Sequence, residues 1–253
     1  MSLDLTPAPQ AAPRTARILG HARIEATLLL RNGEQLILAL VIPVALLVGG
    51  LTLGPRMGLD PTTFPASVLA LALWSTAFTS LAIGTGFERR YGVLERLVAT
   101  PLTRGDLVAG KSLATAAIAT AQLATLAAIA LAAGWRPTPH PAQTLVALIA
   151  VPLAVPTFAA WALALAGRLR AEATLASANL IYLAVAALGA VVLPVAAYPP
   201  AAQPILRLLP PAALAETLRT WASGGLDLAP LAVLAPWLAV SLLVARKAFR
   251  WTS

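Results

Sequence analysis

Long apolar stretches, separated by short polar or Pro/Gly-rich segments, dominate the chain. They fall at residues 36–53, 64–87, 107–133, 144–166, 173–197 and 228–245. Each comes close to or exceeds the roughly 18 to 20 residues that an α-helix needs to cross the hydrocarbon core of a bilayer. The pattern predicts an all-α, polytopic membrane protein with six transmembrane helices.

A different pattern precedes the first of these stretches. Between Arg14 and Arg31, Ile18, Ala22 and Leu29 share one arc of a helical wheel, whereas Arg17 and His21 lie on the other. This amphipathic pattern predicts an interfacial elbow helix over residues 14–33, and a solvated lead-in to the first span is the alternative. The Pro-rich residues 1–13 are expected to form a flexible tail.

The last polar segment, residues 198–227, is too long for a turn and too broken for a span. Five prolines punctuate it, and Pro211 can begin a helix that Gly224 would end. We expect two short helices there, in the outer leaflet, before the last span. The chain shows no internal repeat, so residues 34–253 are predicted to form one six-helix permease domain.

Composition supports a membrane location, because 59% of the residues are hydrophobic and only 11% are charged. With both termini placed in the cytoplasm, fourteen of the 18 basic residues fall on the inner side, and only Arg56, Arg136, Arg207 and Arg219 fall outside. This bias predicts that orientation. The abundance of Ala and Arg is typical of a GC-rich bacterial gene, and the expected location is the cell membrane.

One charged island interrupts the apolar pattern, at residues 88–111 between the second and third predicted spans. Gly92 and Pro101 bracket a helix of about two turns, in which Leu94 and Leu97 form the apolar face. A helix on the membrane surface can dock into a partner's groove, and a solvated loop is the alternative. The basic side chains around the helix are expected to act as interfacial anchors; they are Arg89, Arg90, Arg104 and Lys111.

The start of the third span carries its own local signals. Thr103 is placed to cap the helix, and Asp106 occupies the position that completes a capping box. Residues 105–112 also match the phosphate-loop pattern G-x-x-x-x-G-K-S. A phosphate loop follows a buried strand, whereas this segment enters an apolar span, so we do not interpret it as a nucleotide site.

No ionisable side chain lies in the middle of a predicted span, which argues against an ion-coupled transporter. Aromatic and weakly polar residues in the second and fifth spans could line an apolar path, with helix packing as the alternative; they are Trp74, Phe78, Thr79, Asn179 and Tyr182. The chain has no Cys and only two isolated His residues, so no metal site is expected. The basic residues are too dispersed to indicate nucleic-acid binding.

Residues 87–111 resemble the first cytoplasmic loop of type-2 ABC exporter permeases of the daunorubicin-resistance and nodulation-factor export kind. The shared features are an acidic-basic pair, a Gly, the run Leu-Glu-Arg-Leu, then Thr-Pro, and a Gly-Lys at the start of the third span. The order of elements is also similar, with an elbow helix, six spans and a broken outer segment before the last span.

The resemblance implies that the short helix is a coupling helix that contacts a separate ATP-binding-cassette ATPase subunit. The residues implied in coupling are Gly92, Leu94, Glu95, Arg96, Leu97, Thr100 and Pro101. ATP and Mg²⁺ would then bind to the partner, and this chain would be a non-catalytic permease that pairs with a second copy or a sister permease. Its substrate would be a drug, a lipid or a related amphipathic compound. A secondary transporter or channel, or a non-transporting membrane scaffold, remains the alternative.

Overall fold

The computed structural model describes residues 11–31 and 33–248, and the part of the chain within these ranges is helical without any strand. Most of the predicted tail at residues 1–13 lies outside them. In chain order the elements are α1 (Arg14–Arg31), α2 (Gly33–Thr52), η1 (Gly54–Met57), α3 (Phe64–Trp74), η2 (Ser75–Ser80), α4 (Leu81–Arg90), α5 (Val93–Val98), α6 (Arg104–Ala132), α7 (Pro141–Ala166), α8 (Ala171–Leu188), η3 (Val195–Ala197), α9 (Gln203–Arg207), α10 (Pro210–Ser223) and α11 (Ala229–Ala248).

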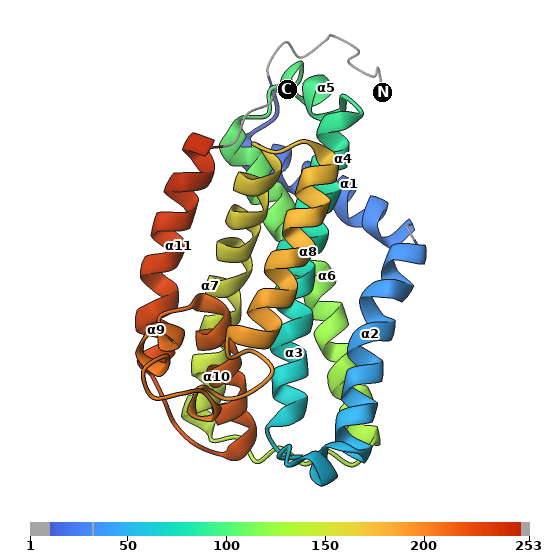
Figure 1. The fold of residues 1–253 in the computed structure, drawn as a ribbon. Coiled ribbons are helices and arrows are strands. Elements are labelled where there is room, and N and C mark those ends of the chain that lie inside the picture. The colour runs from blue at the N-terminus through green and yellow to red at the C-terminus, as the bar shows by residue number, and fades with distance from the viewer. Residues whose placement is uncertain (1–10, 32, 249–253) are drawn as a thin grey trace, which may run out of the picture.

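The longer helices run along the same direction of the molecule, whereas the short ones gather at its two ends (Figure 1). α5 lies at one end, close to the start of α1 and the end of α11, and this end is called the α5 end below. α9 and α10 lie toward the opposite end, called the α10 end. The start of α1 and the end of α11 therefore lie on the same side of the molecule, as an even number of crossings requires.

Four helical segments are long and apolar enough to cross a membrane: Phe64–Arg90, Arg104–Ala132, Pro141–Ala166 and Ala171–Leu188. Leu40–Thr52 of α2 and Ala229–Val244 of α11 are shorter apolar helices. The chain is accordingly a multi-pass membrane protein with four clear candidate spans, and the count of six stays a prediction.

The fifth predicted span is shorter than expected. It was predicted over residues 173–197, but α8 ends at Leu188 and a bend follows, in which Ala190 adopts a positive φ of 54°. α8 ends at its C-cap Gly189, and the carbonyls of Ala190 and Val191 in the bend accept hydrogen bonds from the guanidinium of Arg219, at 2.9 and 2.8 Å. A side chain on a later helix therefore binds the bend that replaces the end of the predicted span.

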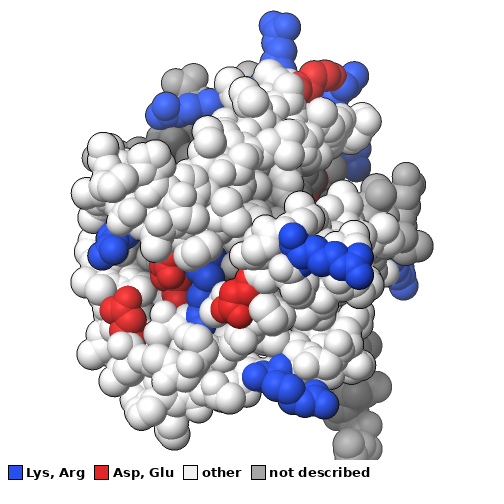
Figure 2. Space-filling view, turned by 60° about the horizontal axis from the view of Figure 1, so that its bottom comes forward, with Lys and Arg blue, Asp and Glu red and all other residues white. Residues whose placement is uncertain are grey.

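α10 confirms the helix expected after Pro211 and ends one residue before Gly224, whose φ of 79° suits glycine. Much of this helix is buried, because it packs against α3, α7 and α11. Arg219 on α10 is only 4% exposed. The space-filling view toward this end of the molecule is largely uncharged, although acidic and basic side chains meet in a hollow near its centre (Figure 2).

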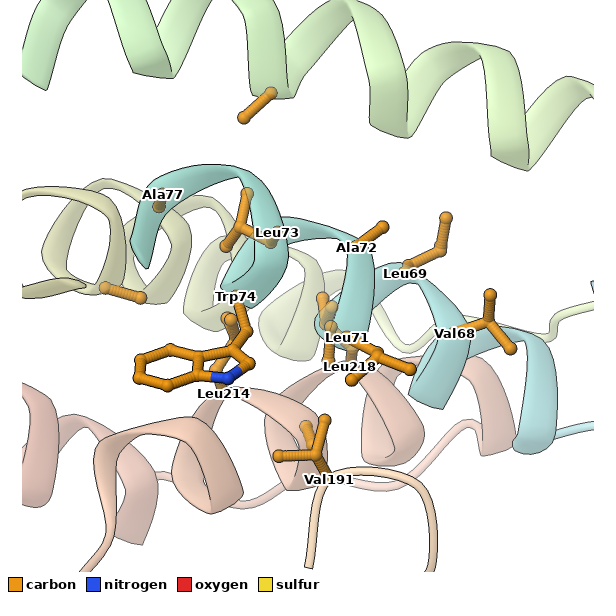
Figure 3. Packing of buried hydrophobic residues seen from close by; sticks show 14 of the residues in the cluster. Val68, Leu69, Leu71, Ala72, Leu73, Trp74, Ala77, Val191, Leu214 and Leu218 are labelled. Carbon is orange, nitrogen blue, oxygen red and sulfur yellow. The ribbon is translucent and has the colours of Figure 1, made fainter. Parts of the chain in front are cut away.

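The core lies around α3, where every residue from Phe64 to Trp74 is buried. Trp74 lies near Leu214 of α10 and Val191 of the bend after α8 (Figure 3). The ring of Phe78 stacks on that of Trp74 with centroids 4.4 Å apart. These two rings flank the start of η2, a π-helical segment in the middle of an otherwise continuous helix.

Candidate functional site

α5 is formed by local backbone chemistry. Gly92 separates it from α4 with a φ of 69°, a left-handed conformation that glycine adopts without a steric penalty. This turn redirects the chain, so that α5 forms a separate short helix at the end of the molecule. After α5, the amides of Ala99 and Thr100 close a final turn, and Pro101 follows.

Leu94 fastens α5 to the helices beneath it. Its side chain has 0% exposure and packs with Leu107 and Val108 of α6 and Leu163 of α7. Leu97 is partly buried against the same cluster. The expectation that Leu94 contacts a partner is therefore wrong, because this side chain holds α5 on its own chain, whereas for the partly buried Leu97 it stays a prediction.

The opposite face of α5 is open. Val93, Glu95 and Arg96 are exposed, and so are Thr100 and Pro101 after the helix. Among the residues predicted to act in coupling, Gly92 and Leu97 are partly buried, and four are exposed: Glu95, Arg96, Thr100 and Pro101. The structure thus divides the predicted set into a buried attachment and an exposed surface.

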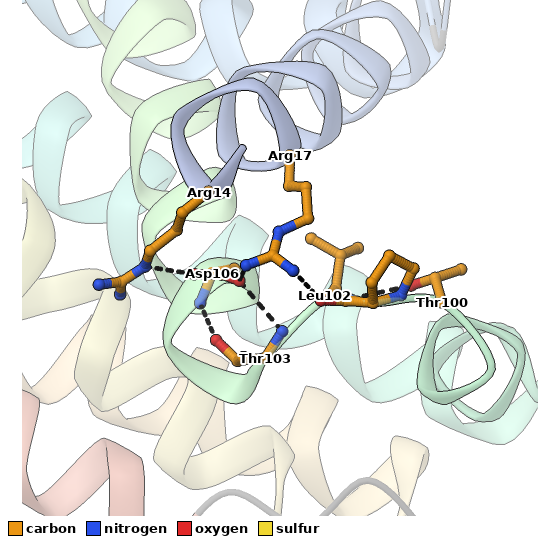
Figure 4. A network of polar contacts seen from close by, with 7 residues as sticks. Arg14, Arg17, Thr100, Leu102, Thr103 and Asp106 are labelled. Atoms are coloured by element: carbon orange, nitrogen blue, oxygen red, sulfur yellow. Dashed lines mark hydrogen bonds and ion pairs between the residues drawn. The ribbon is translucent and has the colours of Figure 1, made fainter. Parts of the chain in front are cut away.

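The start of α6 carries the predicted capping box. The Asp106 amide donates to the Thr103 hydroxyl at 3.1 Å, and the Thr103 amide donates to the Asp106 carboxylate at 3.2 Å. Two arginines from α1 reach the same carboxylate, with Arg14 at 2.7 Å and Arg17 at 3.3 Å (Figure 4). Arg17 also donates to the Pro101 carbonyl at 2.8 Å. α1 is therefore tied to the segment that joins α5 to α6.

A second ionic contact lies deeper along α6. The ammonium of Lys111 lies 2.9 Å from a carboxylate oxygen of Glu25 on α1 and 2.7 Å from one of Glu88 on α4. Lys111 is only 1% exposed, so it does not anchor to headgroups as expected, but joins three helices. Residues 105–112 are helical throughout, which excludes a phosphate loop there.

α1 packs against α6 with a face that combines polar and apolar residues, because its two buried residues are His21 and Ala22. His21 is buried, and its imidazole lies against Gly110, where any side chain would approach it to 2.6 Å. Burial lowers the pKa of His21, an effect that the nearby Glu25 carboxylate partly offsets. Leu19 and Leu30 are exposed, whereas Ala22 of the predicted apolar arc is buried. The helix predicted at residues 14–33 is present over Arg14–Arg31, and polar contacts of His21 and Glu25 add to the burial of Ala22 on the face toward the bundle.

The other predicted anchors serve different purposes. Arg89 donates to the Ala166 carbonyl at the end of α7, at 3.1 Å. Arg90 forms an ion pair with Glu172 at the start of α8. Arg104 is exposed. Two of these basic residues therefore connect the end of α4 to neighbouring helices, next to the turn that begins α5.

The five residues predicted to line a substrate path differ in their exposure, and Tyr182 packs against the core cluster that contains Trp74 and Phe78. Trp74, Phe78 and Thr79 are buried, and the Trp74 ring also makes an edge contact with Phe158, at a centroid distance of 4.9 Å. On α8, Asn179 is exposed and Tyr182 is partly buried. The aromatic pair belongs to the protein core, which favours the packing interpretation of these residues.

Sequence reasoning missed the partners of the charged residues in this site. Glu25 and His21 stood out only as polar positions of an amphipathic helix, and their contacts with α6 depend on how α1 folds back. The signal available was Gly110, since a glycine inside an apolar helix often marks a close helix crossing. Within the part of the chain that the structure describes, no three His, Cys, Asp or Glu side chains are grouped to hold a metal ion.

The comparison with protein families matches most of the helical bundle. The family model for the ABC-2 type transporter matches residues 18–221, from α1 into α10. A comparison with curated proteins gives no match. The chain belongs to the ABC-2 type transporter family. It is therefore a transmembrane component of an ABC transporter, a class that is generally non-catalytic and associates with an ABC ATPase subunit.

Proposed function

We propose that the chain is the permease of an ATP-driven exporter and that α5 is its coupling helix. A separate ATPase subunit would bind and hydrolyse ATP with Mg²⁺, and the exposed face of α5 would sit in a cleft of that subunit. The substrate would be an apolar or amphipathic compound, moved from the cytoplasmic side outward. The α5 end would accordingly face the cytoplasm, with both termini on that side.

The observation that carries this proposal is the two-sided character of α5. Leu94 is fixed in the bundle, whereas Glu95 and Arg96 on the other face are exposed. A helix attached in this way moves together with the helices beneath it. A displacement of α5 by a closing ATPase would therefore pass to α6 and α7 as a rigid-body movement.

The contacts around α5 extend the same argument to the rest of the α5 end. Asp106 connects α6 to α1, and Arg90 connects α4 to α8. α5 lies in the chain between α4 and α6, so a movement at α5 would reach α1 and α8 through these ion pairs. Their positions favour a lever rather than a passive docking site, which is the role that a membrane scaffold would need.

A second permease copy, or a sister permease, would complete the pore. α8 is the candidate span with the smallest buried share, 17% of its most apolar window. Leu180 and Leu183 on this helix are 70% and 61% exposed. Such a surface suits a second permease chain or lipid, and the proposal assigns part of it to the second chain.

The test is reconstitution of the chain with its ATPase partner in vesicles. Glu95→Lys reverses a charge on the exposed face of α5 without touching the buried Leu94. We expect substrate export to fall by about tenfold or more, the equivalent of roughly 1.4 kcal/mol of coupling, while ATP hydrolysis continues. Arg207→Glu, a charge reversal at the exposed Arg207 of the α10 end, is the matched control and should leave export unchanged.

Two results would contradict the proposal. Unchanged export by the Glu95→Lys protein would remove α5 from coupling. Accumulation of substrate by the chain alone, driven by an ion gradient and without nucleotide, would instead identify a secondary transporter.

A further inference from the structure

A cavity of about 380 Å³ lies between α1, α2, the η2–α4 segment and α6. Its volume falls within the range of roughly 300 to 1,000 Å³ that is common for small-molecule sites. The wall contributed by α1 and α2 includes Leu28, Leu29 and Leu40, and Glu25 of α1 is its charged member. Neither the docking surface of α5 nor the Trp74 core cluster accounts for this cavity.

The cavity is elongated along two neighbouring helices. On α6 the lining residues extend from Lys111 to Thr125, which is about 20 Å at a rise of 1.5 Å per residue. On the η2–α4 segment they extend from Thr76 to Glu88, in the opposite direction. Glu88 meets Lys111 at the α5 end, and the Thr76 hydroxyl donates to Gln122 at 2.7 Å farther along. One end is therefore charged and the rest is apolar or weakly polar.

The charged end has an excess of carboxylate. Lys111 faces both Glu25 and Glu88, so the three side chains carry a net formal charge of −1 when both carboxylates are ionised. The side chains of Glu25 and Glu88 are 12% and 25% exposed, whereas that of Lys111 is 1% exposed. The carboxylates are therefore more accessible than the ammonium.

The neighbouring basic groups do not supply the missing positive charge. His21 lies 3.5 Å from Glu25, and its burial favours the neutral imidazole by lowering its pKa. Arg14 and Arg17 are engaged with Asp106 nearer the end of α6. An uncompensated charge in a poorly solvated position is costly, so a cation at Glu25 and Glu88 would be stabilised.

A second observation also indicates a ligand. Thr85 lines the cavity one turn from Glu88 and is only 1% exposed. Within the described chain its buried hydroxyl has no hydrogen-bond partner. A buried hydroxyl without a partner is uncommon in a native protein and calls for an explanation. A polar group of a ligand in the cavity would provide the partner.

We propose that this cavity binds a cationic amphiphile, with its protonated amine at Glu25 and Glu88, a polar group near Thr85, and its apolar body along α6 toward Thr76. The proposal deepens the proposed function by giving the substrate class, and it rests on that function only for the claim that the bound molecule is transported. Binding itself requires neither nucleotide nor a partner subunit.

The experiment uses the purified full chain in detergent, without ATP or an ATPase. The probes are dansylcadaverine, a fluorescent primary amine, and its N-acetylated neutral analogue, and binding is followed by the change in dansyl fluorescence. We expect the amine to bind about tenfold or more tightly than the amide. Glu25→Gln leaves Lys111 and Glu88 as a neutral pair and should reduce that preference to about threefold or less. Glu172→Gln, outside the cavity, should leave the preference unchanged.

A cavity-filling variant locates the binding. A Cβ added at Gly84, which lines the cavity, meets no atom within 4 Å, so Gly84→Leu extends into open space. This variant should abolish binding of both probes. A Cβ at Gly49 on α2 also meets no atom within 4 Å, and Gly49→Leu should leave both affinities unchanged because Gly49 does not line the cavity.

The proposal fails if the wild-type chain binds amine and amide equally, if Glu25→Gln retains the full preference, or if Gly84→Leu still binds the amine. Should Glu25→Gln fail to fold, the comparison of the two probes on the wild-type and Gly84→Leu proteins still decides. The binding experiment contains no ATPase and is therefore independent of the export experiment. Selective binding here, combined with no export in vesicles that contain the ATPase partner, would refute the exporter and keep the binding site.

Discussion

A guanidinium nitrogen of Arg219 donates to the hydroxyl of Ser67 across 2.9 Å, which joins α10 to the start of α3. The same guanidinium donates to two carbonyls of the bend after α8 and pairs with Glu216 at 3.0 Å. Glu216 in turn accepts the amide of Val195 at 2.8 Å. Arg219 therefore holds three separate parts of the α10 end in one arrangement.

Arg219→Met should destabilise the protein by about 3 kcal/mol, because it leaves buried acceptors and the Glu216 carboxylate without their donor. The midpoint of unfolding in detergent measures the effect. Arg207→Met is the control, since Arg207 is exposed, and it should change stability by less than about 0.5 kcal/mol. Equal stability of the two variants would show that the Arg219 contacts do not hold the α10 end together.

Leu94→Ala should cost about 2 to 5 kcal/mol, as the loss of a fully buried leucine does in other cores. The physical reason is the cavity left among Leu107, Val108 and Leu163. Val93→Ala on the exposed side of α5 should have little effect. Unfolding midpoints, together with proteolysis of residues 91–103, compare the two. Similar cleavage of both proteins would mean that Leu94 does not anchor α5.

Gly92→Ala should destabilise by about 1 to 2 kcal/mol, because an L-residue is strained in the left-handed conformation at a φ of 69°. Gly20→Ala is the matched control. Gly20 lies inside α1 with no atom within 4 Å of an added Cβ, so alanine there should be neutral or slightly stabilising. The difference in unfolding free energy between the variants is the measurement, and a value near zero would contradict a required positive φ at Gly92.

Stability should decrease as the pH falls below about 6.5, the usual pKa of histidine. Burial lowers the pKa of His21 in the folded protein, so below that pH the unfolded chain takes up a proton that the folded chain does not. Glu25 on α1 and Lys111 on α6 face the imidazole and act in opposite directions on its pKa. Unfolding midpoints between pH 5.5 and 7.5 test this.

His21→Gln should flatten this part of the pH profile, because it removes the titrating group. His140→Gln should retain the slope, since His140 is exposed. An unchanged slope in the His21→Gln protein would assign the pH dependence to another group.

The features that the sequence predicted well are local ones. The capping box of Thr103 and Asp106 involves residues three positions apart, and Gly92 requires only its own backbone conformation. The end of α10 at Gly224 is of the same kind. In each case neighbouring residues determine the structure, so a single sequence carries the information.

The features that it did not predict depend on distant partners. Lys111 looked like an interfacial anchor, but Glu25, 86 positions away, lies beside it. Hydropathy extended the fifth span to residue 197, whereas α8 ends at Leu188 and the bend that follows is bound by Arg219, 29 positions beyond Ala190. Leu94 belonged to a predicted apolar face, but which surface that face covers is decided by the packing of α6 and α7.

The π-helical segment η2 has a consequence for the charged cluster at Lys111. A π turn holds one residue more than an α turn, so it shifts the rotational phase of α4 relative to α3 by about 100°. With that shift Trp74 points into the core while Glu88, on the same long helix, points at Lys111. Deleting one residue within positions 75–80 would remove the extra residue of the π turn and leave Glu88 facing Lys111. Deleting one residue between positions 81 and 87 would instead rotate Glu88 around the helix and turn its carboxylate away from the ammonium.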